Sequence, residues 1–299
     1  MRYYQASIER AKEYDDLVGR GIKPSPAQTR LGRQMEKDER FWVAAALMTL
    51  YHATGRPKGE TFGRMLERAR LRPPSGFADW ADALAGPIDL FFEVSLPSPR
   101  GYRDWLRQQL DERVPIPYLR ENAAASGTRL EGPTHADAML LAPDTGVAVI
   151  FEAKVLSDVS THVTFDIARN QIARTIDVML EAPGPHLPLS QRKPERTFLM
   201  LLTPALMQPN GSEDAISKTR LYGWLMPAYQ DSGNSLLSQH LPHRDSLQLA
   251  EAARRCGWAS WEDCEALAPN ACRWLAATPH DPSRPRWQGD GAARCRSRH

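Results

Sequence analysis

The amino-acid sequence predicts an α/β protein whose sheet lies in the middle of the chain, with helical regions before and after it. Short β-like runs cluster between residues 128 and 203. Apolar residues at helical spacing dominate the chain before residue 95 and after residue 210. The chain has 299 residues, of which 42% are hydrophobic, and this is enough to bury one large core or two modest ones.

Residues 1–99 are expected to form a mostly helical N-terminal region. The segment RFWVAAALMTLYHATG has dense apolar content and no strong breaker before Gly55, and ETFGRMLERARL repeats the pattern more weakly. The Pro/Gly-rich stretches RPPSG and LPSPRG are typical of loops. Between them, IDLFFEVSL has the composition of a strand.

Residues 100–210 are expected to form the α/β core. GYRDWLRQQLDERV predicts an amphipathic helix, and PIPYLRENAAASG predicts a shorter one. Three β-like runs follow, TRLEG, ADAMLLAP and GVAVIFEAK, and the PDTG between the last two favours a hairpin turn. We expect these three runs to form a meander.

A helix and a strand are expected to complete this core. TFDIARNQIARTIDVML predicts the helix, since it carries a stripe of apolar residues at helical spacing and Thr164 as a candidate N-cap. RTFLMLLTP is an uninterrupted apolar run, which is typical of a strand buried on both faces. The expected order is therefore helix, three-strand meander, helix, strand.

Residues 211–278 are expected to be helical again. KTRLYGWLMPAYQ predicts one helix, and DSLQLAEAARRCGWASWEDCEALAP contains two helical patterns around Gly257. The latter resembles a helix-turn-helix, although such pairs are more often packing elements than readers of DNA. Residues 279–299 are rich in arginine and small residues and are predicted to form a disordered basic tail.

Composition narrows the cellular setting and the partners. No apolar run approaches the roughly 18 residues that span a bilayer, and the N-terminus is charged. We therefore expect a soluble, cytoplasmic protein with no membrane partner. The four cysteines, Cys256, Cys264, Cys272 and Cys295, match no common zinc spacing and are predicted to be packing thiols. A net charge of only +2 means that any nucleic-acid surface must be local.

Charged residues stand at the ends of two predicted strands. Asp137 opens one strand, and Glu152 and Lys154 close its hairpin partner. Antiparallel pairing through the PDTG turn brings these ends together at one edge of the sheet. Two carboxylates in apolar surroundings repel unless a cation lies between them, and oxygen ligands favour Mg²⁺ or Mn²⁺. Such an ion activates water and stabilises charge on phosphorus, so the pattern predicts phosphodiester hydrolysis.

The layout HADAMLLAPDTGVAVIFEAK, followed by a helix bearing RNQ and then an apolar strand, resembles the PD-(D/E)XK nuclease superfamily with its restriction-endonuclease-like fold. The resemblance covers roughly residues 100–205, and Ala136 stands where that family often has proline. It implies that Asp137 and Glu152 are ligands of Mg²⁺ or Mn²⁺ and that Lys154 is the catalytic lysine. Gln171 would be the helical partner that orients the lysine or contacts DNA.

The same resemblance implies a glutamate on the helix before the first strand as a further metal ligand. We favour Glu121 for this position, with Glu112 and Glu131 as alternatives. His135 shares a face with Asp137 but is interpreted as a turn histidine without a catalytic role. Two arginines of the following helix, Arg169 and Arg174, are predicted to meet the DNA backbone.

The leading hypothesis is thus a metal-dependent endonuclease that acts on double-stranded DNA in bacterial restriction, phage defence or mobile-element biology. By family analogy it would work as a homodimer or as a subunit of a larger defence or mobile-element complex. Two alternatives stay open. One is a non-catalytic nucleic-acid-binding or assembly subunit that retains the nuclease fold, and the other is a structural ion-pair cluster in an unrelated α/β protein.

Overall fold

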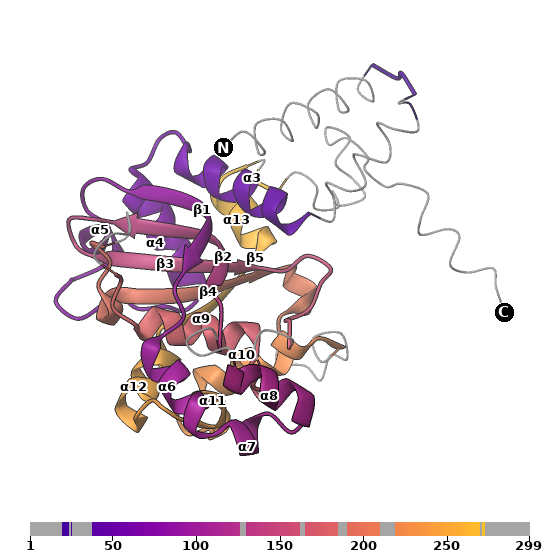
Figure 1. Cartoon of the computed structure of the whole chain (residues 1–299). Coiled ribbons are helices and arrows are strands. Elements are labelled where there is room, and N and C mark those ends of the chain that lie inside the picture. The colour runs from indigo at the N-terminus through magenta and orange to yellow at the C-terminus, as the bar shows by residue number, and fades with distance from the viewer. Residues whose placement is uncertain are drawn as a thin grey trace.

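The computed structural model of the chain describes residues 20–23, 25, 38–125, 130–161, 165–184, 190–209, 219–269 and 271–272. In these residues a mixed sheet of five strands lies between two layers of helices (Figure 1). The predicted α/β class is confirmed.

The sheet contains the strands in chain order, with β1 and β5 at its edges. Its members are β1 (Asp89–Leu96), β2 (Thr134–Ala142), β3 (Val147–Ala153), β4 (Thr197–Thr203) and β5 (Cys256–Ser260). The first three form an antiparallel meander, and β4 and β5 continue parallel to β3. Every residue of β3 and β4 is buried, as expected for apolar runs covered on both faces.

Within the described residues, one face of the sheet is covered by four helices, α3 (Glu39–Tyr51), α4 (Lys58–Arg68), α5 (Trp80–Ala83) and α13 (Trp261–Leu267). Asp38 caps α3, since its carboxylate accepts a hydrogen bond from the Arg40 amide at 3.2 Å. Phe41 and Leu47 of α3 share a core with Phe151 of β3. This core explains the dense apolar content of the α3 sequence, because neighbours surround most of the helix.

The opposite face carries α9 (Gln171–Leu180), α10 (Leu221–Gln230), α11 (Leu236–His240) and α12 (Ser246–Arg254). Figure 1 shows these helices below the sheet and α3 above it. Ile172 and Ile176 of α9 share a second core with Ile150 of β3. Two short 3-10 helices, η1 (Pro194–Arg196) and η2 (Ala205–Met207), flank β4.

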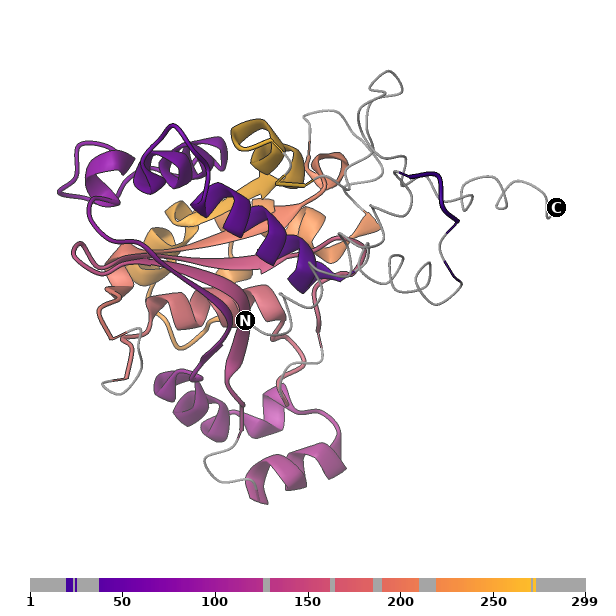
Figure 2. The ribbon, with the colours of Figure 1, turned by 90° about the horizontal axis from the view of Figure 1, so that it is seen from above.

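Three helices form a lobe that is inserted between β1 and β2. They are α6 (Arg100–Gln108), α7 (Leu110–Arg113) and α8 (Pro117–Ala125). A small core of their own, built on Tyr102 and Leu106, holds them together. In Figure 2 the lobe projects to one side of the sheet, at the end of the β1 and β2 strands.

The predicted meander is correct in its last two strands and wrong in its first. Leu130, Glu131 and Gly132 of the TRLEG segment form no strand, and its first two residues lie outside the described part of the chain. The first strand is β1, so the strand prediction for IDLFFEVSL is confirmed. Its Val94 and Leu96 alternate with the exposed Glu93 and Ser95 and pair with β2, whereas the Glu131 carboxylate of TRLEG is bound by Arg169. The PDTG turn joins β2 to β3 as predicted, with Gly146 at φ 74°.

Two predicted helical boundaries are also corrected. Helix α9 begins at Gln171, six residues after Phe165, because the Asn170 side chain caps it by accepting a hydrogen bond from the Ala173 amide at 3.0 Å. Thr164 lies outside the described residues. The supposed helix-turn-helix has a buried strand, β5, between α12 and α13. Gly257 fits that strand because a Cβ there would lie 2.7 Å from a Leu71 methyl carbon.

The sheet crosses the boundaries predicted at residues 99 and 210, since β1 comes from the N-terminal region and β5 from the C-terminal region. Cys256, Cys264 and Cys272 are buried free thiols. Cys295 and the predicted tail, residues 279–299, lie outside the described residues. In the part of the chain that the structure describes, no helix has both the length and the apolar character needed to cross a bilayer.

Candidate functional site

Four residues singled out in the sequence meet at one edge of the sheet. Glu152 and Lys154 lie at the end of β3, and the Lys154 Nζ is 2.6 Å from the Glu152 Oε1. Gln171, the first residue of α9, donates from its Nε2 to the same oxygen at 2.5 Å. Asp137 of β2 accepts a hydrogen bond from the Ala153 amide at 2.7 Å through its Oδ2. Three separate elements therefore contribute to a single polar cluster.

The sheet register explains this convergence. Ala138 pairs with Phe151, so Asp137 and Glu152 come next in line on adjacent strands. The chain then leaves β3 and returns as α9 to reach β4, which is parallel to β3. This crossover starts α9 at the carboxyl end of β3, and the Asn170 cap fixes its first turn beside Glu152.

A fifth residue, Glu39 in the first turn of α3, belongs to the same cluster and was missed in the sequence. Its Oε1 accepts hydrogen bonds from the Val155 amide at 2.9 Å and from the Ser157 hydroxyl at 2.6 Å. Its Oε2 lies 3.9 Å from the Lys154 Nζ. Glu39 therefore anchors the loop after β3 with one oxygen and faces Lys154 with the other.

The glutamates predicted for this position lie elsewhere, which is a correction. Glu121 is exposed on α8 of the lobe, and Glu112 is exposed on α7. Glu131 is buried, but Arg169 binds its carboxylate. The sequence could have indicated Glu39. Once the first strand is placed at residues 89–96, the described helices that precede it are α3, α4 and α5, and Glu39 is the first residue of α3. Placing that strand at TRLEG directed the search to the wrong helices.

Burial and mutual repulsion perturb the charges in the cluster. Burial and the nearby Asp137 carboxylate together raise the pKa of Glu152 to about 8, against the opposing effect of Lys154. Burial also raises the pKa of Asp137. For Lys154, burial favours the neutral amine, but Glu152 and Glu39 outweigh it and raise the pKa. Lys154 is therefore an ammonium at neutral pH, whereas burial favours the protonated forms of Asp137 and Glu152.

The residues present fit a divalent cation in their chemistry. The Glu152 Oε2 is buried and has no hydrogen-bond partner in the described structure, so one carboxylate oxygen is left for another ligand. Asp137, Glu152 and Glu39 supply the oxygen donors that Mg²⁺ and Mn²⁺ prefer. Within the described residues, however, no three acidic, His or Cys side chains already lie together as a metal cluster. The Lys154 ammonium and the Gln171 amide occupy the Glu152 Oε1 instead.

Arg169 was predicted to meet the DNA backbone, but its side chain does not face solvent. Its side chain is fully buried, binds the Glu131 and Asp177 carboxylates at 2.9 and 2.7 Å, and lies 3.5 Å over the Tyr102 ring. Arg174 donates to the backbone carbonyls of Gly132 and Pro133. These arginines attach the lobe to α9 because their partners, apart from Asp177, lie in or beside the lobe. His135 is exposed at the start of β2.

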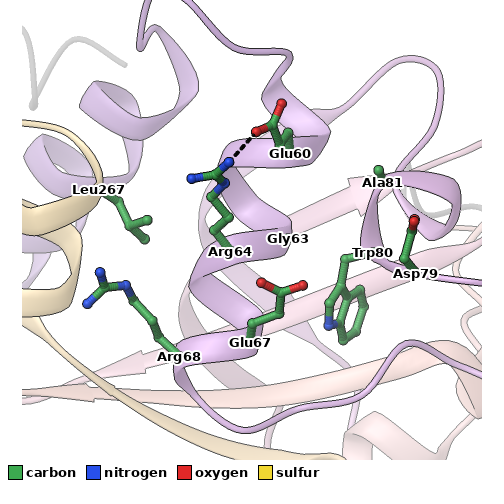
Figure 3. A pocket seen from close by; sticks show the side chains of 9 residues that line it. All are labelled: Glu60, Gly63, Arg64, Glu67, Arg68, Asp79, Trp80, Ala81 and Leu267. Carbon is green, nitrogen blue, oxygen red and sulfur yellow. Dashed lines mark hydrogen bonds and ion pairs between the residues drawn. The ribbon is translucent and has the colours of Figure 1, made fainter.

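A groove of about 590 Å³ lies on the outer helical layer, between α4, α5 and α13 (Figure 3). Its charged lining is largely compensated, since Arg64 binds Glu60 at 2.8 Å and Arg68 binds Asp263 at 2.9 Å. None of the five clustered residues lines it. We therefore assign the candidate site to the strand edge and not to this groove.

Comparisons of the chain with protein-family models, with curated proteins and with solved structures give no match. The function is therefore inferred from the strand-edge cluster, which consists of Glu39, Asp137, Glu152, Lys154 and Gln171.

Proposed function

We propose that the chain is a metal-dependent phosphodiesterase of the PD-(D/E)XK type with a restriction-endonuclease-like core, acting on double-stranded DNA. The observation that carries this proposal is the convergence of Asp137, Glu152, Lys154 and Gln171 at one sheet edge. A plain ion pair between Glu152 and Lys154 would leave the second carboxylate on the neighbouring strand unexplained. Glu39 adds the helical acid that the family resemblance implies, from an unexpected helix.

In this proposal Asp137, Glu152 and Glu39 hold Mg²⁺ or Mn²⁺, with Glu39 in place of Glu121. When bound, the ion polarises a phosphate oxygen and makes water more acidic. Gln171 keeps the Glu152 carboxylate in position by donating to its Oε1. The chain thus presents its three ligands from two neighbouring strands and from the first turn of α3, and Gln171 at the start of α9 orients one of them.

Lys154 has a defined electrostatic part in this reaction. Its Nζ lies 2.6 Å from the Glu152 Oε1 and 3.9 Å from the Glu39 Oε2, and this setting favours an ammonium that stabilises negative charge on the attacked phosphate over an amine that accepts a proton from water. The side chain is buried beside Glu152, so the charge acts at low dielectric and is fixed in place. The setting in restriction, phage defence or mobile-element biology, and work as a homodimer or larger complex, remain part of the proposal.

The direct test is to incubate the purified full chain with supercoiled plasmid and Mg²⁺ or Mn²⁺, beside an Asp137→Ala variant. We expect the wild type to nick or linearise the plasmid and EDTA to stop it. The variant should cleave at least about a hundredfold more slowly while binding DNA with similar affinity. A wild type that binds no metal and cleaves neither DNA nor RNA would refute the proposal. DNA binding without cleavage, unchanged in the variant, would support a non-catalytic subunit.

Glu39→Gln is expected to lower the cleavage rate by about tenfold to a hundredfold, with weaker binding of Mn²⁺. Glutamine keeps an oxygen that accepts from Val155 and Ser157, so the docking of α3 should survive. Glu121→Gln is the matched control and should leave the rate unchanged, because Glu121 is exposed on the lobe. Mn²⁺ titration and single-turnover cleavage measure both effects. If the two variants changed Mn²⁺ binding and the cleavage rate equally, a role of Glu39 as a metal ligand would be refuted.

A further inference from the structure

Glu93 of β1 has a backbone conformation that is rare for its residue type. Its φ is 51°, in the left-handed region that favours glycine. Among the described residues, Arg70 at φ 60° is the one other non-glycine residue with positive φ. Such strain persists where the surroundings impose it, and it often accompanies functional sites. Glu93 lies directly across from Asp137, because Phe92 pairs with Ala138 and Val94 with Ala136.

In both β1 and β2, the side chains exchange faces of the sheet at the level of Glu93 and Asp137. Before it, Phe92 and its partner Ala138 pack into the core under α3. After it, Val94 and its partner Ala136 pack into the opposite core, under α9. In a regular strand, residues two apart point to the same face. The alternation therefore inverts in both strands at Glu93 and Asp137.

The strands β2 and β3 also separate at the level of Glu93 and Asp137. Pairing between β2 and β3 begins at Ala138, whereas β1 and β2 stay paired as far as Leu96 and Thr134. The outer parts of β1 and β2 thus leave the sheet as a two-stranded ribbon that leads into the lobe (Figure 2). At the point of departure the Ala153 amide of β3 donates to the Asp137 carboxylate.

The Glu93 side chain explains little of this arrangement. Its carboxylate binds Arg40 at 3.3 Å, and both side chains are about half exposed. Exposed pairs of this kind contribute little to stability. The backbone conformation of Glu93, by contrast, coincides with the inversion in its own strand and in the strand that carries Asp137.

We propose that Glu93 is a positioning residue of the strand-edge site. Its left-handed backbone turns the ribbon away from β3, and this holds the Asp137 carboxylate on the Ala153 amide, beside Glu152. The consequence for metal binding rests on the proposed function. The consequence for Asp137 does not, because the hydrogen bond to Ala153 exists without any ion.

Three substitutions separate backbone from side chain. Glu93→Gly and Glu93→Asn both remove the carboxylate but accept positive φ, whereas Glu93→Val also removes it and opposes positive φ. Arg70→Val is the matched control, because it opposes the same conformation outside the site. The metal-free readout is hydrogen exchange of the Ala153 amide in the full chain, with Asp137→Ala as the reference for complete loss. The second readout is Mn²⁺ affinity.

We expect Glu93→Val to speed Ala153 exchange and to weaken Mn²⁺ binding by about tenfold or more each. Glu93→Gly, Glu93→Asn and Arg70→Val should stay close to the wild type in both readouts. If Glu93→Val leaves Ala153 protected, or if glycine is as harmful as valine, the positioning role is refuted. Wild-type protein that binds no Mn²⁺ would overturn the proposed function, while the exchange data would still decide the role of Glu93.

Discussion

Replacing Lys154 by methionine is expected to reduce single-turnover cleavage of DNA by about two to three orders of magnitude. Methionine has a similar length but no charge, so negative charge that develops on the attacked phosphate loses its fixed ammonium partner. The affinity for DNA should change little, because one buried cation contributes little to contacts along the phosphate backbone. Cleavage under Mg²⁺ and fluorescence anisotropy under Ca²⁺ give the two quantities separately.

Lys58→Met is the matched control for this experiment. Lys58 lies at the start of α4, where its ammonium packs over the Tyr51 ring away from the site, and its loss should leave cleavage unchanged. Because Lys154→Met leaves Glu152 buried without its cation, thermal melting must show that the variant is folded. A folded Lys154→Met protein with wild-type cleavage would reduce Lys154 to a structural counter-ion of Glu152.

Arg169→Met is expected to have the largest effect on stability, a loss of about 3–5 kcal/mol in the free energy of unfolding. The substitution removes a fully buried guanidinium and leaves the Glu131 and Asp177 carboxylates without it. Arg174 and Arg244 remain beside these acids but cannot replace the bridge between them. Urea unfolding at neutral pH measures the change, and loss of the lobe packing would accompany it.

Arg254→Met is the control, since its side chain is 64% exposed and its pair with Glu251 lies on the surface, so the change should stay below about 1 kcal/mol. The pH dependence of unfolding gives a second check on the interaction between Arg169 and Asp177. Burial alone would raise the pKa of Asp177, but the His243 hydrogen bond and the charges of Arg169 and Arg244 lower it. The stability from Asp177 is therefore complete above about pH 4 and lost as the pH falls through the lowered pKa. A difference between wild type and Arg169→Met that grows on acidification would contradict this account.

Local sequence patterns predicted the elements whose signals are self-contained. The apolar run of β4, the PDTG hairpin and the charged ends of β2 and β3 all depend on residues close together in the chain. Burial on both faces makes a continuous apolar strand, and a short turn forces its neighbours to pair. For the same reason the sequence was sufficient to bring Asp137, Glu152 and Lys154 to one edge.

Elements that depend on distant partners were predicted less well. The sequences before and after β5 have helical patterns, and β5 itself becomes a strand through parallel pairing with β4. Arg169 was predicted to contact DNA from its place beside the site, yet its guanidinium is buried between the Glu131 and Asp177 carboxylates. Local periodicity carries no information about a counter-charge such as Glu131, which lies 38 residues from Arg169 in the chain.

The sequence by itself determined the α/β class, the hairpin at the centre of the sheet and the acidic and basic residues at its edge, because period and turn chemistry are local. The tertiary structure decided that Glu39 joins them, that β1 opens the meander and that the lobe leaves the sheet at Glu93 and Asp137. These features arise from pairing and packing between segments that only the folded chain brings together. A helix 98 residues before Asp137 contributes to the site because the sheet edge lies against its first turn.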